Sequence, residues 1–207
     1  MQRLEEFPRI AYDTNCLVYY CFEVNIPDSN PKRTVRADLT ERTKIITEIL
    51  KSKGKKITTI QAAYWELQGC VYTAVIREME KPGVKEMLGI PQNTPIREQT
   101  KLHIQSTVER HVKKLQSATW LVVDSQFKAS QAAFTSLREF FNSIPAEELG
   151  NCEKASAVDI QLINFGAVQR IPLITHDGGI YRFTTRLQAK GLAFRIYGLT
   201  QLVPFSN

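Results

Sequence analysis

The sequence has few of the residues that build disulfide-rich or zinc-binding proteins. It contains four cysteines and three histidines, and the cysteines form no C-x-x-C pair. Disulfide frameworks and structural zinc sites need such residues in closely spaced sets. We therefore expect the cysteines to be small buried side chains in a reducing compartment. They are Cys16, Cys21, Cys70 and Cys152.

Long hydrophobic runs are also missing. Residues 1–6 (Met-Gln-Arg-Leu-Glu-Glu) contain no apolar signal region. No stretch approaches the roughly 20 apolar residues that cross a bilayer. These absences predict a cytoplasmic protein without a membrane segment. No repeat, low-complexity tract or clear linker divides the 207 residues, which we expect to form one domain, 1–207.

The charge balance is basic. The chain has 27 lysines and arginines against 21 aspartates and glutamates, a formal net charge of +6. Such a surface favours a polyanionic partner, with nucleic acid as the first candidate. A basic surface that is merely solvated remains open, because net charge alone does not distinguish the two.

Apolar segments with strand and helix character alternate along the chain, which predicts an α/β fold with a parallel sheet covered on both faces. Five strands are expected, at residues 10–12, 55–59, 119–123, 173–175 and 193–197. Helices are expected at 16–21, 41–53, after residue 59, and at 102–115, 124–141, 152–169 and 185–190. Residues 24–40 and 81–100 have the character of insertions, and the prolines and glycines of the second predict irregular structure.

Two acidic residues follow expected strands. Asp13 comes after the first strand and Asp177 after the fourth. The carboxyl ends of parallel strands form the crevice in which α/β proteins bind ligands, so both side chains should face one site. Two further acids, Glu66 and Asp159, fall on expected helices that could reach the same crevice.

Four converging carboxylates repel one another unless a cation holds them. Hard oxygen ligands in this number suit Mg²⁺ or Mn²⁺. A Mg²⁺ ion held this way lowers the pKa of a water and contacts a phosphate oxygen, which is the chemistry of phosphodiester hydrolysis. The four acids thus predict a metal-dependent phosphodiesterase.

Each acid also has a simpler structural interpretation. Asp13 could cap a helix, Glu66 could be solvated, and Asp177 could serve a turn before two glycines. Asp159 lies between Val158 and Ile160, where an unpaired charge would be costly to bury. Three other residues are weaker candidates: Glu153 as an extension of the acidic site, Asp124 as a helix cap, and His176 as a substrate contact.

Basic residues near the expected strand ends are candidates for contacts to phosphate. Arg182, Arg186 and Lys190 follow Asp177, and Lys154 precedes Asp159. Lys32, Arg33 and Arg36 lie in the first insertion and could flank the same cleft.

Taken in order, these motifs resemble the PIN domain, a family that includes the VapC-like toxin ribonucleases. The resemblance rests on Asp13-Thr14-Asn15 after the first strand, the Thr-Thr pair before the helix of Glu66, and Asp159 on a later helix. It ends with Thr-His-Asp-Gly-Gly at 175–179. The spacing between the acids is longer than in compact toxin members.

The resemblance implies a three-layer α/β/α sandwich with a central parallel five-stranded sheet. It implies that Asp13, Glu66, Asp159 and Asp177 bind one or two Mg²⁺ or Mn²⁺ ions, with Thr14, Asn15 and Thr175 orienting carboxylates or waters. It also implies an endoribonuclease acting on RNA, an antitoxin partner and a homodimer. Two alternatives stay open: a non-catalytic PIN scaffold that binds RNA or a protein, and, less favoured by the sequence, a doubly wound phosphotransfer domain.

Overall fold

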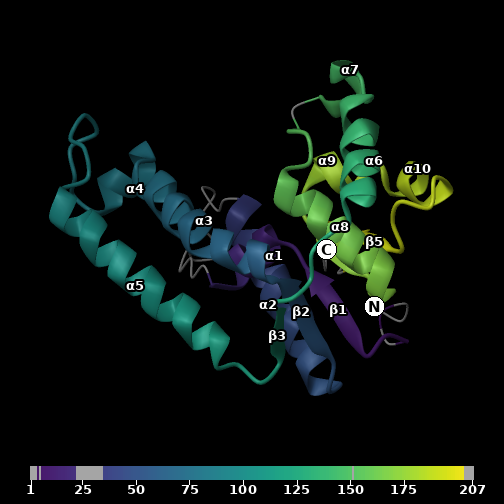
Figure 1. Ribbon diagram of the computed structural model, residues 1–207. Coiled ribbons are helices and arrows are strands. Elements are labelled where there is room, and N and C mark those ends of the chain that lie inside the picture. Colours follow the sequence, from purple (N-terminus) through teal and green to yellow (C-terminus); the bar gives the residue numbers. More distant parts are fainter. Residues whose placement is uncertain (1–3, 5, 22–34, 151, 203–207) are drawn as a thin grey trace.

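The computed structural model describes residues 4, 6–21, 35–150 and 152–202. Residues 24–34 of the first expected insertion, with Lys32 and Arg33, lie outside this set, as does the side chain of Arg36. Figure 1 shows the arrangement of the chain, with the strands at the centre.

Five parallel strands form one sheet in the order β3-β2-β1-β4-β5. They are β1 (Arg9–Tyr12), β2 (Lys56–Ile60), β3 (Leu121–Asp124), β4 (Leu173–Thr175) and β5 (Ile196–Gly198). Helices flank the sheet, so the expected α/β fold with a parallel five-stranded sheet in three layers is confirmed.

Alternation along the strands divides the hydrophobic residues between two cores. In β1, Ile10 and Tyr12 belong to one core and Ala11 to the other. In β4, Leu173 and Ile174 divide in the same way. This period of two places successive side chains on opposite faces of the sheet, so each strand contributes to both layers.

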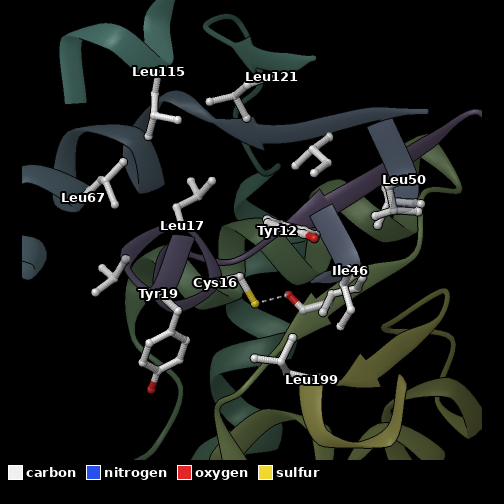
Figure 2. Close-up of a cluster of buried hydrophobic side chains, with 14 of the residues drawn as sticks. Tyr12, Cys16, Leu17, Tyr19, Ile46, Leu50, Leu67, Leu115, Leu121 and Leu199 are labelled. Atoms are coloured by element: carbon white, nitrogen blue, oxygen red, sulfur yellow. Dashed lines mark hydrogen bonds between the residues drawn. The ribbon is translucent and has the colours of Figure 1, made fainter. Parts of the chain in front are cut away.

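Different helices complete the two cores. The first core includes residues of α1 (Thr14–Cys21), α2 (Val35–Ser52), α3 (Gln61–Met79), α5 (Glu98–Gln116) and α11 (Leu199–Leu202). Figure 2 shows part of it, with Tyr12 of the sheet close to Ile46 and Leu50 of α2. The second core includes residues of α6 (Gln131–Asn142), α7 (Ala146–Leu149), α8 (Ala157–Gln169), α9 (Gly178–Tyr181) and α10 (Thr184–Ala189).

The second expected insertion is more regular than its composition predicts. Residues 81–100 contain α4 (Pro82–Met87) and the start of α5. Lys85 is buried, forms an ion pair with Glu80, and donates to the carbonyls of Gln92 (3.2 Å) and Thr94 (3.0 Å). These bonds fold the segment back on itself, so the expectation of irregular structure was wrong for the helical part.

Two helix starts also differ from expectation. Asp124 does not cap a helix: its Oδ1 accepts from the N–H groups of Gln126 (3.0 Å) and Phe127 (2.9 Å) in a local turn. The next helix begins at Gln131 and is capped by Ser130. Likewise, α8 begins at Ala157 and not at Cys152, because Ser156 caps it.

A buried hydroxyl pair joins the central strand to α2. The hydroxyls of Tyr12 and Thr47 lie 3.1 Å apart, and both residues are fully buried. Burial raises the pKa of Tyr12 well above its usual range, so the phenol stays protonated and able to donate. The pair satisfies two polar groups that would otherwise lack a partner in the core.

We expect Thr47→Val to lower the free energy of unfolding by about 1–3 kcal/mol, because it leaves the Tyr12 hydroxyl buried without a partner. The double variant Tyr12→Phe/Thr47→Val removes both groups and should recover much of this loss. Urea denaturation of the three proteins measures the difference. A double variant at least as unstable as the sum of the single variants would contradict the assignment.

Candidate metal centre

The strand order changes direction between β1 and β4. The chain builds outward from β1 through β2 to β3 on one side, and through β4 to β5 on the other. Neighbouring parallel strands whose connections diverge in this way leave a crevice at their carboxyl ends, where α/β proteins bind ligands. Asp13 directly follows β1, and Asp177 lies two residues beyond the end of β4.

Asp13 is held at the centre of this crevice. Its side chain is 1% exposed. Oδ1 accepts from the N–H of Cys16 (2.7 Å), as the cap of α1 does, and Oδ2 accepts from the hydroxyl of Thr175 at the end of β4. Burial raises the pKa of Asp13 to about 6, although these hydrogen bonds oppose the rise.

Asp159 approaches from α8. It forms a capping box with Ser156: the Ser156 hydroxyl accepts from the N–H of Asp159 (3.2 Å), and Asp159 Oδ2 accepts from the N–H of Ser156 (2.7 Å). This reciprocal pair fixes the first turn of the helix. Burial raises the pKa of Asp159, while the two bonds to Ser156 lower it.

Asp177 caps α9 through Gly179, whose N–H donates to Oδ1 (2.7 Å). The two glycines that follow Asp177 admit close neighbours. A Cβ at Gly179 would lie 2.1 Å from the carbonyl oxygen of Glu153, and one at Gly178 would lie 2.7 Å from Sγ of Cys152. Glycine is therefore required at position 179, where the backbone of the segment before α8 packs against it beside Asp177.

Glu66 joins the cluster through α1. Thr14, the residue after Asp13, donates its hydroxyl to Glu66 Oε2 (2.9 Å). This bond directs the Glu66 carboxylate towards the first turn of α1. Glu66 is exposed, whereas Thr14 is buried. The carboxylate thus lies at the solvent side of the crevice.

Electrostatic effects indicate that the acids are neighbours. The charge of Asp159 contributes to raising the pKa of both Asp13 and Asp177. The charges of Glu66 and Asp159 both contribute to raising the pKa of Cys70, after burial as the main cause. The charge of Asp159 thus acts on both Asp13 and Asp177, and Glu66 is linked to this region through Thr14 and Cys70.

Within the described ranges, no ion pair compensates these charges. Ion pairs in these ranges lie elsewhere, among them Lys51–Glu48, Lys85–Glu80, Lys101–Glu98, Arg186–Glu148 and Arg195–Glu6. Nor does the described part of the chain hold three His, Cys, Asp or Glu side chains grouped tightly enough to ligate one ion as they stand.

The donor set nevertheless fits Mg²⁺ or Mn²⁺. All four groups are hard carboxylate oxygens, and Mg²⁺ is commonly bound through one or two carboxylates while it keeps several waters. A divalent ion would stabilise a buried carboxylate such as Asp13, on which the charge of Asp159 also acts. Asp13 would be the innermost ligand, and Asp159 and Asp177 would lie beside it.

The residues predicted to orient carboxylates or waters differ in their burial and contacts. Thr175 is buried and binds Asp13, and its Oγ1 also accepts from the N–H of Asp177 (2.9 Å), so it connects two of the acids. Asn15 is exposed in the first turn of α1. Sequence reasoning overlooked Ser156, although a serine three residues before an acid at a helix start is a recognisable capping signal.

The basic candidates differ in their surroundings. Arg182 is exposed, and its Nε would lie 3.6 Å from a Cβ on Gly178, which places it beside Asp177. Lys154 is exposed in the segment packed against the same glycines. Arg186 instead forms an ion pair with Glu148 (2.5 Å) and lies over the ring of Phe183.

Comparisons with known proteins add no relative. No family model matches the chain, and no curated protein matches it.

In the described part of the chain, no helix combines the length and the apolar composition needed to cross a membrane.

The raised pKa of Asp13 predicts how stability depends on pH in the absence of metal. The folded state holds a proton up to about pH 6, whereas the ordinary value is 3.8. In EDTA the Asp13 contribution should therefore lower the free energy of unfolding as the pH rises from about 4 to about 6, by about 3 kcal/mol. Asp13→Asn removes this dependence and should be the more stable protein above pH 6. Urea denaturation across this pH range measures both proteins.

Asp124→Asn is the matched control, since it makes the same change at the end of β3 away from the cluster. It should show no gain in stability above pH 6. If Asp13→Asn proves no more stable than the unsubstituted protein at pH 7.5, the carboxylate of Asp13 is not destabilised by its surroundings.

Proposed function

We propose that this protein is a divalent-metal-dependent nuclease that hydrolyses phosphodiester bonds, with RNA as substrate. The observation that carries the proposal is the burial of Asp13, without a cationic partner among the described residues, at the end of β1 beside β4, where the strand order changes direction. The charge of Asp159 acts on both Asp13 and Asp177, and Glu66 accepts a hydrogen bond from Thr14, the residue after Asp13. The choice of RNA, the role of toxin, the antitoxin partner and the homodimer are proposed from the PIN resemblance.

The residues of this site would act together with a bound cation. When bound, Mg²⁺ or Mn²⁺ would activate water and stabilise the charge that develops on the phosphate. Asp13, which follows β1, and Asp159, in the first turn of α8, would both be ligands of the ion. Thr175 and Ser156 keep these two carboxylates in fixed orientations through the hydrogen bonds described above.

Positive side chains would position the substrate. Arg182 and Lys154 are exposed near Asp177 and are suited to contact phosphates on either side of the scissile bond. Arg186 is a weaker candidate, because Glu148 already neutralises its guanidinium. Contacts to phosphate give affinity without base specificity, so target choice would depend on other residues.

A non-catalytic scaffold is the second candidate, and one observation favours it. Asp13, Asp159 and Asp177 each accept a backbone N–H at the start of a helix. Such caps stabilise a fold whether or not a metal binds. Retention of these three acids is therefore compatible with a protein that binds RNA or another protein without cutting.

Cleavage assays distinguish the two candidates. We expect the purified protein to cut labelled single-stranded RNA with Mg²⁺ or Mn²⁺ and not with EDTA. Asp159→Asn should reduce the rate at least 100-fold, because the amide removes a negative ligand while its Oδ1 can still accept a hydrogen bond from Ser156. Labelled DNA tested in parallel shows whether the protein prefers ribose or deoxyribose in its substrate.

Asp124→Asn again serves as the control and should cut at the unsubstituted rate. If Asp159→Asn retains the full rate, the assigned centre is wrong. Binding of RNA without cutting, under every metal condition, would support the scaffold.

A further inference from the structure

Trp65 is an exposed aromatic residue beside the candidate centre. Its side chain is 75% exposed, the largest value among the large hydrophobic residues described as exposed. It belongs to the second turn of α3, just beyond the carboxyl end of β2, and directly precedes Glu66. The only other tryptophan, Trp120, contacts Tyr20 at a ring distance of 5.0 Å and precedes β3, at the opposite end of the sheet.

The surroundings of Trp65 leave a flat side chain accessible. Adjacent residues on a helix project about 100° apart, so the indole flanks the carboxylate of Glu66. One turn further along, Gly69 is exposed, and a Cβ added there would meet no heavy atom within 4 Å. One turn before it, Ala62 packs against the second core. Before Trp65 the helix packs against the second core at Ala62, and after it the surface at Gly69 is open.

We propose that Trp65 stacks on an unpaired nucleobase next to the phosphate held at the candidate centre, so that the site selects single-stranded nucleic acid. This inference rests on the proposed function. Aromatic rings stack on bases of any sequence, and a duplex cannot present the face of a base in this way. A phosphate near Asp13 and Glu66 brings its neighbouring base within reach of the residue that adjoins Glu66.

Charge supports a division of labour between the two sides of the site. Arg182 and Lys154 are exposed beside Asp177, on the side of α9. Trp65 lies on the side of α3, next to the acidic Glu66, which would repel any phosphate that the bound cation does not hold. A base is uncharged, so the acidic side of the site suits a base and the basic side suits the backbone.

Fluorescence tests the stacking directly. The variant Trp120→Phe leaves Trp65 as the only tryptophan and keeps an aromatic ring beside Tyr20, and Asp13→Asn is added to prevent cleavage. Three probes are titrated in Mg²⁺: an octamer of uridine, an abasic octamer with the same number of phosphates, and a base-paired RNA duplex. We expect the uridine octamer to quench the emission of Trp65, and the other two to leave it nearly unchanged.

Affinity and cleavage provide the second measurement. Trp65→Ala should weaken binding of the uridine octamer about tenfold, within the range known for loss of one stacked base, and should leave the affinity for the abasic octamer unchanged. Trp65→Phe should restore most of the affinity. Val168→Ala is the matched control, because Val168 is 61% exposed at the far end of α8 and its loss should change neither affinity.

The outcomes separate this inference from the proposed function. Equal weakening for both octamers, or no quenching by the uridine octamer, would overturn the stacking role even if the protein cuts RNA. Cleavage of single strands and duplexes at equal rates by the unsubstituted protein would do the same. Concentration-dependent quenching without any nucleic acid would assign Trp65 to contact with a second copy and overturn the inference. Absence of metal-dependent cleavage by the unsubstituted protein would instead count against the proposed function.

Discussion

The hydrogen bond from Thr175 to Asp13 is the contact on which the arrangement of the candidate centre depends. It connects the ends of β1 and β4, the neighbouring strands between which the strand order changes direction. The two residues are 162 positions apart in sequence. Thr175 also accepts from the N–H of Asp177, so one hydroxyl binds the carboxylate of Asp13 and the backbone of Asp177. Because Asp13 is buried, its charge costs free energy unless such donors, or a cation, offset it.

Helix starts supply further compensation. Asp13 precedes α1, and Asp159 lies in the first turn of α8. The N-terminal end of a helix carries partial positive charge, which favours a carboxylate there. Two helix starts that converge on one crevice can therefore hold two acids close together while no metal is bound. Asp13 and Asp159 can therefore cap helices and also serve as metal ligands, because the two roles are compatible in the folded protein.

The sequence predicts local features better than contacts between distant segments. The alternation of strand-like and helix-like apolar segments predicts the parallel sheet, and acids at strand ends predict the location of the candidate site. The bond between Thr14 and Glu66 joins residues 52 positions apart, and no local pattern reveals it. The fold of residues 81–100 depends on buried Lys85, whose partners Gln92 and Thr94 lie in a stretch that reads as irregular. Asp124 was misread because a carboxylate that closes a turn resembles one that caps a helix.

Burial decreases across the four acids in a consistent direction. Asp13 is fully enclosed, Asp159 and Asp177 are half-buried, and Glu66 is exposed. A cation entering from solvent would meet Glu66 before it reached Asp13, and each step inward places it in a less polar environment where opposite charges attract more strongly. If the proposed function holds, a polyanion would approach from the exposed side of the candidate site, between Glu66 on α3 and Arg182 beyond β4. Trp65 lies on that side, so a base stacked there and a phosphate at the carboxylates can belong to one strand.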